Sequence, residues 1–434
     1  MSESIDFLVT NIGQLCTVPA HDGGPQRGHR LGDLGLREHA AIAAHEGIII
    51  EVGDSIDLAA RYSATHQIDA EGRLVTPGLV DPHTHVLWAG DRADEFERRI
   101  AGATYQQIMA EGGGINRTML ATRHASIHQL IDETKPRLNA MLAHGSTTIE
   151  CKTGYGLNTP SEIAMLTAIA LLDMEHPAEL AATFLGAHAI PPEYADDPDG
   201  YVTLICDEML PAVVQWRDEH WPGTLFCDVF CEVGAFDLDQ TRRILEAAKA
   251  HGLGLKVHID EFESLGAGRL AAELGAISVD HVVVTSDDDI EAIAQSDTIA
   301  VALPPTPFGL GLPHYTPARR FIDAGAALAI ATDCNPGTGW NESMQFVMAL
   351  AARYLHLTPA EALAAATINA AFAIDRADHV GSIEVGKQAD VVIWNVPSYP
   401  FLSYRFGSNL AHTVIKRGHI AHSADWRALL AWMG

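Results

Sequence analysis

The chain has 434 residues, with 28 Lys and Arg against 56 Asp and Glu, which gives a formal net charge of -28. This excess of negative charge repels phosphate backbones and anionic lipid surfaces, so we expect no nucleic-acid partner and no membrane partner. With 47% hydrophobic residues the chain can bury a large core, and its length allows roughly two or three domains, or one large α/β barrel with an appendage.

The cysteines and the first residues bear on the compartment. Six cysteines are scattered along the sequence, a pattern typical of buried thiols in a reducing compartment and not of a disulfide framework. The opening stretch, MSESIDFLVTNIGQL, lacks the basic and apolar regions of a signal peptide. We therefore expect a cytoplasmic protein.

Eight short apolar segments rich in β-branched residues indicate strands. They are residues 73–85, 146–152, 181–188, 225–232, 253–260, 277–281, 298–305 and 327–333. Helix-like stretches such as 239–252 and 264–276 lie between them, with apolar residues recurring every three to four positions. This alternation predicts the α/β class and a (β/α)8 TIM-like barrel. No GxGxxG turn follows the first segment, which disfavours a doubly wound sheet.

The two flanks of this region also have strand and turn patterns, including AAIAAHEGIIIEVGD near the start and VGKQADVVIWN near the end. The ends of a chain often lie close together. We therefore expect residues 1–72 and 380–434 to form one small β-sandwich-like domain, with residues 73–379 as the barrel.

Most of the predicted strands end in a side chain that can bind a metal or move a proton. These side chains are His83, His85, Lys152, His188, Glu232, His258 with Glu261 just after it, His281 and Asp333. Because the carboxyl ends of all strands in a barrel meet at one face, we expect them to form one site.

His83 and His85 are two positions apart, so both side chains point the same way along a strand and can bind one ion. Together with His258 and Asp333, they predict a catalytic divalent-metal site with a position open for water. His281 is either a further ligand or a partner of Asp333 and of the developing oxyanion. We count His281 and Asp333, with Glu261, as the catalytic candidates.

Three of these residues have alternative interpretations. Glu261 can reach back over the metal as a general base, or be a solvated loop carboxylate. Lys152 and Glu232 could bridge a second metal, but Lys152 could equally pair with Glu150 and Glu232 could be a buried structural carboxylate. We favour one metal.

The motifs PHTH, VHID, VDH and ATD resemble the amidohydrolase superfamily over nearly the whole chain. Within it, longer strings resemble the imidazolonepropionases, namely VDPHTHVLWAGDRADEF, GGGINRT, KTGYGL, TFLGAHAIPPEY, DVFCE and ATDCNPGT. The resemblance implies that the cyclic amide of 4-imidazolone-5-propanoate, a small anionic heterocycle, is hydrolysed to N-formimidoyl-L-glutamate in histidine degradation. It also implies a homodimer.

The resemblance further implies one zinc or iron ion per chain, bound by His83, His85, His258 and Asp333, with Glu261 holding the attacking water. It implies substrate contacts from Arg92, Tyr155, His188, Asn335, Gly337 and Thr338. Arg92 also suits this role chemically, because a guanidinium can bind the propionate through two parallel hydrogen bonds. The alternative for Arg92 is a salt bridge with Asp91 or Asp94.

Two segments depart from the imidazolonepropionase pattern, at residues 303–315 and 338–343, and both flank the predicted pocket. They leave three alternatives open. The first is a related cyclic amide such as a hydantoin or a thio-imidazolone propionate. The second is an aminohydrolase that deaminates a heterocycle. The third, a non-catalytic metal-binding or ligand-binding protein, is disfavoured because such a protein has no need of Glu261 as a proton carrier.

Overall fold

Two sheets of eight strands organise the chain in the computed structural model, which describes residues 3–103, 107 and 112–425. The terminal sheet contains β1 (Glu3–Leu15), β2 (Arg37–His45), β3 (Ile48–Asp54), β4 (Tyr62–Asp69), β5 (Leu74–Pro77), β14 (Val391–Trp394), β15 (Ala411–Lys416) and β16 (His419–Ser423). The second sheet contains β6 (Leu79–Asp81), β7 (Ser146–Lys152), β8 (Glu179–Ala187), β9 (Phe226–Cys231), β10 (Gly254–Ile259), β11 (Ser278–His281), β12 (Ile299–Ala302) and β13 (Ala327–Ile330).

The second sheet is a parallel barrel whose strands pair in chain order from β6 to β13. The segments that follow β6 and β13 close it. Thr84 and Cys334 form a parallel bridge, the Asp333 N–H donates to the His83 carbonyl (3.1 Å) and the His85 N–H donates to the Cys334 carbonyl (3.0 Å). Three of the predicted site residues therefore lie at the seam of the barrel. The predicted fold class, a (β/α)8 barrel with a β domain from both ends of the chain, is confirmed.

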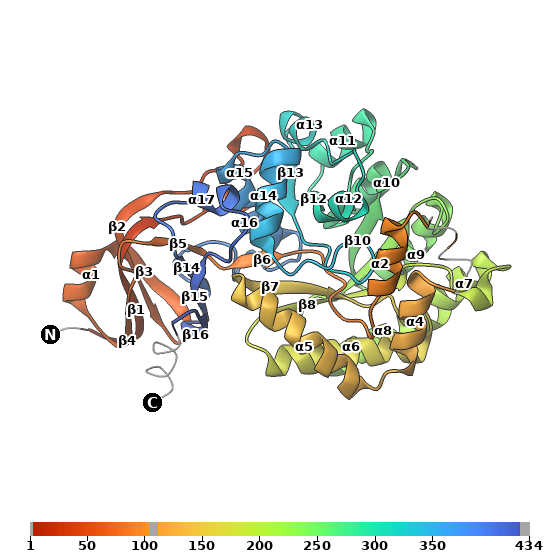
Figure 1. Cartoon of the computed structure of the whole chain (residues 1–434), viewed down its shortest axis with the longest axis horizontal. Helices are drawn as coiled ribbons and strands as arrows, with labels where there is room; N and C mark the ends of the chain where they lie inside the picture. The colour runs from red at the N-terminus through yellow and green to blue at the C-terminus, as the bar shows by residue number, and fades with distance from the viewer. Residues whose placement is uncertain (1–2, 104–106, 108–111, 426–434) are drawn as a thin grey trace.

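Helices cover the outside of the barrel (Figure 1). The described α-helices are α1 (Ser55–Arg61), α2 (Ala93–Ile100), α4 (Ile115–His124), α5 (Ile127–Ala143), α6 (Thr159–Glu175), α7 (Pro198–Leu204), α8 (Leu210–His220), α9 (Leu238–Ala250), α10 (Ala267–Leu274), α11 (Asp287–Ala294), α12 (Pro305–Leu310), α13 (Ala318–Asp323), α14 (Met344–Tyr354), α15 (Pro359–Ala365), α16 (Ile368–Phe372) and α17 (Pro400–Tyr404). Two short 3-10 helices, Gly28–Arg30 and Pro192–Tyr194, and a π-helix, Ile205–Met209, accompany them. Within the described ranges, none of them is both long and apolar enough to span a bilayer.

Helix α9 shows how local sequence sets these elements. It begins with a capping box, in which Asp237 and Gln240 each accept a hydrogen bond from the other's backbone N–H, and such a box satisfies donors that the first helical turn leaves free. Its buried residues Ile244, Leu245 and Ala248 lie on one face, at the spacing that packs a helix against a sheet.

Residues 73–85, which we predicted as one strand, form two strands in different sheets. β5 pairs with β1 and β14 in the terminal sheet, and β6 begins the barrel after Gly78. A Cβ atom added at Gly78 would lie 2.1 Å from the Thr147 hydroxyl. Only glycine therefore lets the chain pass this close to β7 as it crosses between the sheets.

The terminal sheet joins both ends of the chain, because β5 lies between β1 and β14. Figure 1 shows its first strands beside the last ones, next to the barrel. It has its own apolar core, with Phe7, Val9, Ile42, Val391 and Ile393 buried together. Residues 1–2 and 426–434 of the predicted β domain lie outside the described residues, and the limits of the two domains stay a prediction.

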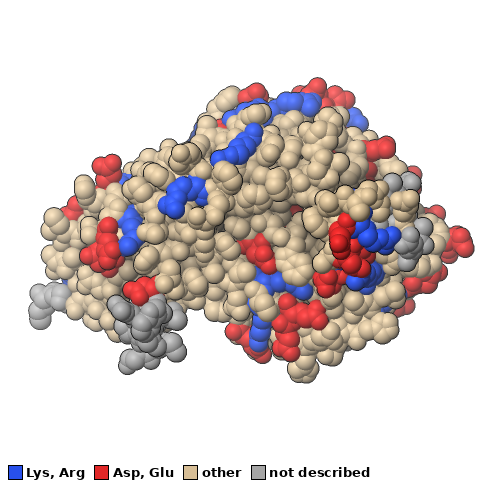
Figure 2. Space-filling model, in the orientation of Figure 1, with Lys and Arg blue, Asp and Glu red and all other residues tan. Residues whose placement is uncertain are grey.

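The charge on the face drawn in Figure 2 is of mixed sign. Blue Lys and Arg side chains lie scattered among red Asp and Glu side chains, in a chain whose acidic residues outnumber its basic ones two to one. This face presents both signs to any charged partner.

Candidate active site

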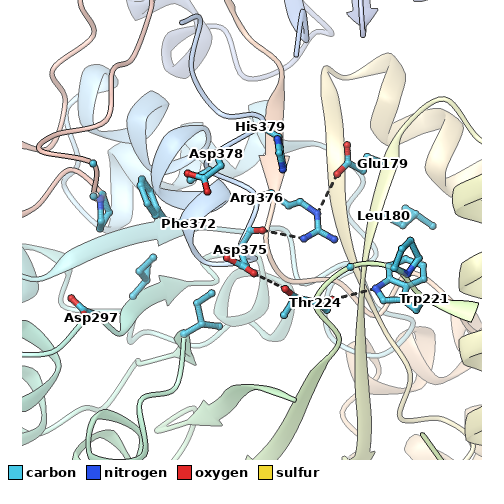
Figure 3. Close-up of a pocket in the computed structure, with 18 of the residues that line it drawn as sticks. Glu179, Leu180, Trp221, Thr224, Asp297, Phe372, Asp375, Arg376, Asp378 and His379 are labelled. Carbon is cyan, nitrogen blue, oxygen red and sulfur yellow. Dashed lines mark hydrogen bonds and ion pairs between the residues drawn. The ribbon is translucent and has the colours of Figure 1, made fainter. Parts of the chain in front are cut away.

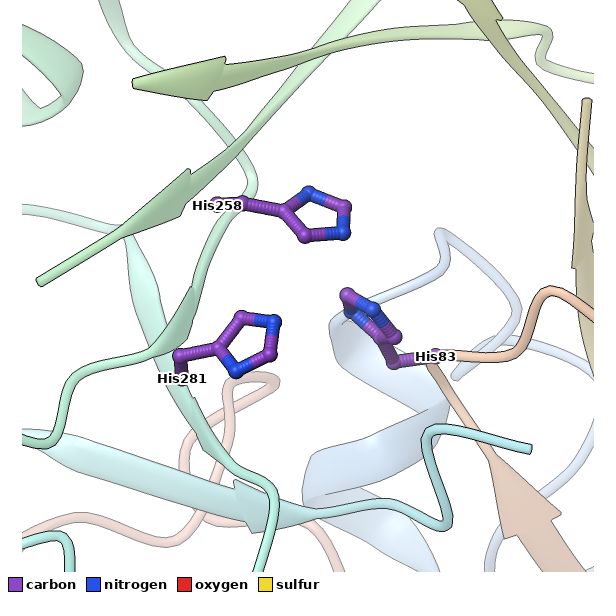
Figure 4. A group of neighbouring side chains, drawn as sticks. All are labelled: His83, His258 and His281. Atoms are coloured by element: carbon purple, nitrogen blue, oxygen red, sulfur yellow. The ribbon is translucent and has the colours of Figure 1, made fainter. Parts of the chain in front are cut away.

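Four imidazoles and a carboxylate meet at the carboxyl ends of the barrel strands. His83 and His85 follow β6, His258 lies on β10, His281 ends β11 and Asp333 follows β13. Figure 4 shows the rings of His83, His258 and His281 converging from three separate segments. The His258 and His85 Nε2 atoms are 3.3 Å apart, and Asp333 Oδ1 lies 3.7 Å from His83 Nε2 and 3.6 Å from His85 Nε2.

Two buried carboxylates set the orientation of two of these rings. His83 Nδ1 donates to Asp280 Oδ2 (2.6 Å), and His258 Nδ1 donates to Asp228 Oδ1 (3.0 Å). Because an ionised carboxylate can only accept, the proton lies on Nδ1 in both rings. The Nε2 lone pairs of His83 and His258 are therefore left to face the centre of the site, as in carboxylate–histidine–metal arrangements.

The residues present fit a divalent metal. His83 Nε2 is buried and has no hydrogen-bond partner among the described residues, and a bound cation would satisfy it. Burial lowers the pKa values of His83, His85 and His281 well below the usual range, so these rings are neutral, which is the form that ligates a metal.

Glu261 lies beside this group, on the loop after β10. Its Oε2 is 3.7 Å from His281 Nδ1. Burial, and then the charges of Asp333 and Glu232, raise the pKa of the Glu261 carboxyl well above its usual range. The Glu261 side chain is only 10% exposed and lies against the His281 ring, which contradicts a solvated loop carboxylate and leaves it placed for proton transfer at this site.

Glu232 holds the loop that carries Glu261. Its carboxylate accepts hydrogen bonds from the backbone N–H groups of Phe262 (2.9 Å) and Glu263 (3.2 Å), and from that of Val233 (2.9 Å). The first two groups directly follow Glu261 in the chain. Glu232 therefore acts as a structural carboxylate that fixes the backbone beside the predicted base.

Lys152 is likewise engaged in structural contacts beneath the site. Its Nζ lies 2.7 Å from Asp228 and 2.9 Å from Glu150, with all three side chains fully buried. Burial opposes the charge of this lysine, but Asp228 and Glu150 outweigh that effect and raise the pKa of Lys152. An ammonium has no lone pair for a metal, so these contacts favour the single-metal interpretation.

Tyr155, His188 and His85 form a layer of rings next to the centre. The His188 ring stacks on His85 with centroids 4.8 Å apart, and the Tyr155 centroid is 5.3 Å from that of His188. His188 Nδ1 donates to the Gly154 carbonyl (3.0 Å), which leaves its Nε2 free to accept. Burial lowers the pKa of His188 to about 3, so this ring is neutral.

The loop of Tyr155, which lies between Gly154 and Gly156, is held in place by two side chains. Glu162, fully buried on α6, accepts hydrogen bonds from Gly154, Gly156 and Leu157 N–H. Arg123 donates to the Gly156 and Leu157 carbonyls from the other side. Three donors and two acceptors of one loop are thus fixed by two side chains.

Arg92 and the loop after β13 also meet. Arg92 Nε donates to the Thr118 hydroxyl (2.8 Å), and a Cβ atom added at Gly337 would lie 2.6 Å from Arg92 Nη1. Asp94, one of the alternative partners predicted for Arg92, binds Arg117 through both oxygens at 2.6 and 2.8 Å. The guanidinium therefore lies on the loop that contains Gly337.

Asn335 shapes this loop. Its Oδ1 accepts from the Gly337 and Thr338 N–H groups (2.8 Å each), and its Nδ2 donates to the Asp333 carbonyl and the Thr338 hydroxyl. The side chain thus orders the backbone between Asp333 and Thr338. Asp333 itself has a φ of 49°, in the left-handed region, which Asp adopts more readily than most non-glycine residues.

A model of the amidohydrolase family matches residues 74–421. The chain belongs to the amidohydrolase family. Among its relatives are the imidazolonepropionases of Herpetosiphon aurantiacus, 52% identical with 96% of this chain and 97% of the relative covered, and of Chloroflexus aggregans, 48% identical with 96% and 99% covered. A crystal structure of a Xanthomonas campestris adenosine deaminase with bound zinc superposes with a TM-score of 0.69 at 20% identity, covering 99% of this chain and 97% of that one. The similarity to this deaminase structure shows a shared fold and nothing more.

Sequence reasoning missed four residues that position the amidohydrolase site. They are Asp228, Asp280, Glu162 and Thr306. The Thr306 hydroxyl donates to Asp333 Oδ2 (2.5 Å). Asp228 and Asp280 each lie inside an apolar strand, and an acid there needs a buried partner. That signal could have singled out both acids, although not their partners.

Both departing segments contact the site region. Trp340, from 338–343, packs edge-on against Trp88 with ring centroids 4.9 Å apart, next to the buried Arg137 guanidinium. Thr306 belongs to 303–315. These segments therefore support the loops after β6 and β13 through contacts of their own.

A separate cavity of about 800 Å³ lies at the other end of the barrel. Among its lining residues, Leu180, Ile277 and Ile299 lie at or just before the amino ends of β8, β11 and β12. Figure 3 shows Arg376 in this cavity, paired with Glu179. The metal-type site lies at the carboxyl ends of the strands, so this cavity is no part of it.

Proposed function

We propose that this protein hydrolyses the cyclic amide of 4-imidazolone-5-propanoate to N-formimidoyl-L-glutamate, a step of histidine degradation. The observation that carries the proposal is a site in which His83 groups with His85 and Asp333, and also with His258 and His281, beside the largely buried Glu261. The chain is 52% identical to an imidazolonepropionase over 417 residues. A hydrolase with one divalent metal is the simplest enzyme that uses this set of side chains.

We propose His83, His85, His258 and Asp333 as the ligands of one zinc or iron ion. Asp333 Oδ1 lies 3.7 Å from His83 Nε2 and 3.6 Å from His85 Nε2, and His258 Nε2 lies 3.3 Å from His85 Nε2. These distances support the proposal, and neutral imidazoles with a carboxylate suit either metal. When bound, the metal supplies Lewis-acid activation of the attacking water and of the amide carbonyl.

The side chains around the proposed metal site divide the proton transfers between them. Glu261 accepts a proton from the attacking water as the water oxygen bonds to the ring carbonyl carbon, and returns it to the ring nitrogen as the C–N bond breaks. His281, 3.7 Å from Glu261, stabilises the oxyanion that develops at the carbonyl. The substrate gains one water and releases no ammonia.

Arg92 supplies the cation that the propionate needs, at the loop of Gly337. Tyr155 and His188 form the ring layer against which the flat imidazolone packs, with His188 Nε2 as an acceptor for a ring N–H. Asn335 and Thr338 hold the loop at the other side of the ring. The mouth of the site therefore combines one fixed cation with neutral aromatic groups, which suits a flat heterocycle with a carboxylate tail.

An assay with freshly made imidazolone propionate and metal-loaded protein tests the proposal. Loss of the ring's ultraviolet absorbance, a mass gain of one water and no free ammonia are the expected results. Ammonia release from another heterocycle, with no turnover of imidazolone propionate, would instead indicate a deaminase. Turnover of a hydantoin or thio-imidazolone propionate alone would indicate a related cyclic amide as the substrate.

We also propose a cytoplasmic homodimer. All six cysteines are free in the structure, which suits a reducing compartment, and the dimer rests on the family resemblance. Light scattering of the purified protein tests the dimer.

A further inference from the structure

Thr306 makes a short, buried hydrogen bond to one of the proposed metal ligands. Its hydroxyl donates to Asp333 Oδ2 at 2.5 Å, and Thr306 and Asp333 are only 1% and 3% exposed. The Asn335 side chain also interacts with the Asp333 carboxylate, but the hydrogen bond to Oδ2 comes from the Thr306 hydroxyl. The other carboxylate oxygen, Oδ1, is the one that faces His83 and His85.

The position of the Thr306 hydroxyl is fixed by its surroundings. Pro304, Pro305 and Pro307 surround it in the sequence, and proline fixes its own φ and restricts the residue before it. Helix α12 also packs directly on the loop after β13, because a Cβ atom added at Gly309 would lie 2.0 Å from the Thr338 carbonyl oxygen. The donor and the carboxylate thus sit on two segments held against each other.

A carboxylate has two equivalent oxygens and can turn about its Cβ–Cγ bond. A hydroxyl that holds Oδ2 removes this freedom and leaves Oδ1 as the oxygen aimed at the imidazoles. We infer that Thr306 is a positioning residue, which selects Oδ1 of Asp333 as the metal-binding oxygen and keeps it in place. The inference rests on the proposed ligand role of Asp333, and it gives residues 303–315, which differ from the expected imidazolonepropionase pattern, a part in the site.

The test compares Thr306→Val, which keeps the shape and loses the hydroxyl, with Thr306→Ser, which keeps the hydroxyl. Thr298→Val is the matched control, because Thr298 is also 1% exposed and its hydroxyl also donates a hydrogen bond, to the Ala276 carbonyl (2.7 Å). Thr298 directly precedes the amino end of β12, whereas the site lies at the carboxyl ends of the strands. For each variant we would measure Zn²⁺ affinity by competition with a chromophoric chelator. The visible spectrum of the Co²⁺-substituted protein reports on the ligand geometry independently of turnover.

We expect Thr306→Val to weaken Zn²⁺ binding about 10- to 100-fold, the usual effect of removing a group that orients a metal ligand, and to alter the Co²⁺ spectrum. Thr306→Ser should restore both, and Thr298→Val should leave both unchanged. If Thr306→Val does not fold, Thr306→Ala makes the same test without the second methyl group.

Asp333→Asn tests the ligand role of Asp333 separately from the positioning role of Thr306. If Asp333→Asn weakens Zn²⁺ binding but Thr306→Val does not, Asp333 is a ligand and the role of Thr306 is refuted. If Asp333→Asn leaves Zn²⁺ affinity and the Co²⁺ spectrum unchanged, the proposed ligand set fails, and the inference fails with it. An equal loss in Thr298→Val and Thr306→Val would show a general packing effect and would also refute the role.

Discussion

We expect Glu179 to make the free energy of unfolding depend on pH in the acidic range. This residue begins β8 and binds Lys416 (3.1 Å), Arg417 (3.1 Å) and Arg376 (3.2 Å), so it ties the barrel to the terminal sheet. Burial alone would raise the pKa of the Glu179 carboxyl, but these cations outweigh burial and lower the pKa from 4.5 to about 2. The difference corresponds to roughly 3 kcal/mol of folding free energy, at about 1.4 kcal/mol per pKa unit.

The sign follows from the direction of this change. Because the folded state has the lower pKa, the full contribution of Glu179 is present above about pH 4.5 and is lost as the pH falls toward 2. We expect Glu179→Gln to lower the free energy of urea unfolding by about 3 kcal/mol at pH 7, and the gap to wild type to close at lower pH. Glu175→Gln is the control, because Glu175 pairs with Lys135 but is 54% exposed, and exposed pairs contribute at most about 1 kcal/mol. A gap that stays constant from pH 7 to pH 3 would refute the reasoning.

Three further predictions concern the site. Glu261→Gln should retain the metal, as measured by elemental analysis, while kcat falls at least about 100-fold, the usual contribution of a general base; near-normal kcat would exclude that role. Glu232→Gln should lower kcat about 10- to 100-fold with unchanged metal content, because the peptide after Glu261 loses part of its anchor. If Glu232 acts through Glu261, the double variant Glu232→Gln/Glu261→Gln should be no less active than Glu261→Gln alone. Arg92→Lys keeps the charge but loses the two parallel bonds, so steady-state kinetics should show KM raised about 10-fold and kcat little changed, whereas an unchanged KM would place the propionate elsewhere.

The strands could be predicted from the sequence because a buried parallel strand is a short apolar run with clear ends. Residues 146–152 coincide with β7, and the His and Asp residues that end other strands meet as expected. The prediction failed at residues 73–85, where the apolar runs before and after Pro77-Gly78 belong to different sheets. Apolar residues are buried equally well in either sheet, so hydrophobicity alone could not assign the two runs, but the Pro-Gly pair was a signal of the break.

The pairing of Lys152 with Glu150, two positions away, was predicted as an alternative and is present at 2.9 Å. The long-range partners of the site residues could not be predicted, because each of those pairings depends on how distant segments meet in three dimensions. Asp280 and His83 are 197 positions apart in the sequence. They become neighbours only because the closed barrel brings β11 close to the segment that follows β6. Likewise, Lys152 reads as a possible metal ligand until Asp228, 76 positions later, is seen beside it. Sequence patterns identify reactive side chains at strand ends, whereas the closed barrel determines which of them are already paired.

The loops around the site are held through their peptide groups. Glu162 and Glu232 accept backbone N–H groups from the loops of Tyr155 and Glu261. The Phe262 and Glu263 side chains of the second loop are exposed. The backbone shape of these loops therefore does not depend on their exposed side chains, since replacing such a side chain leaves the hydrogen bonds to the peptide groups intact. Such loops can exchange their outward residues for others that recognise a different ring, which makes this barrel mouth a suitable frame for evolving or designing hydrolases of related cyclic amides.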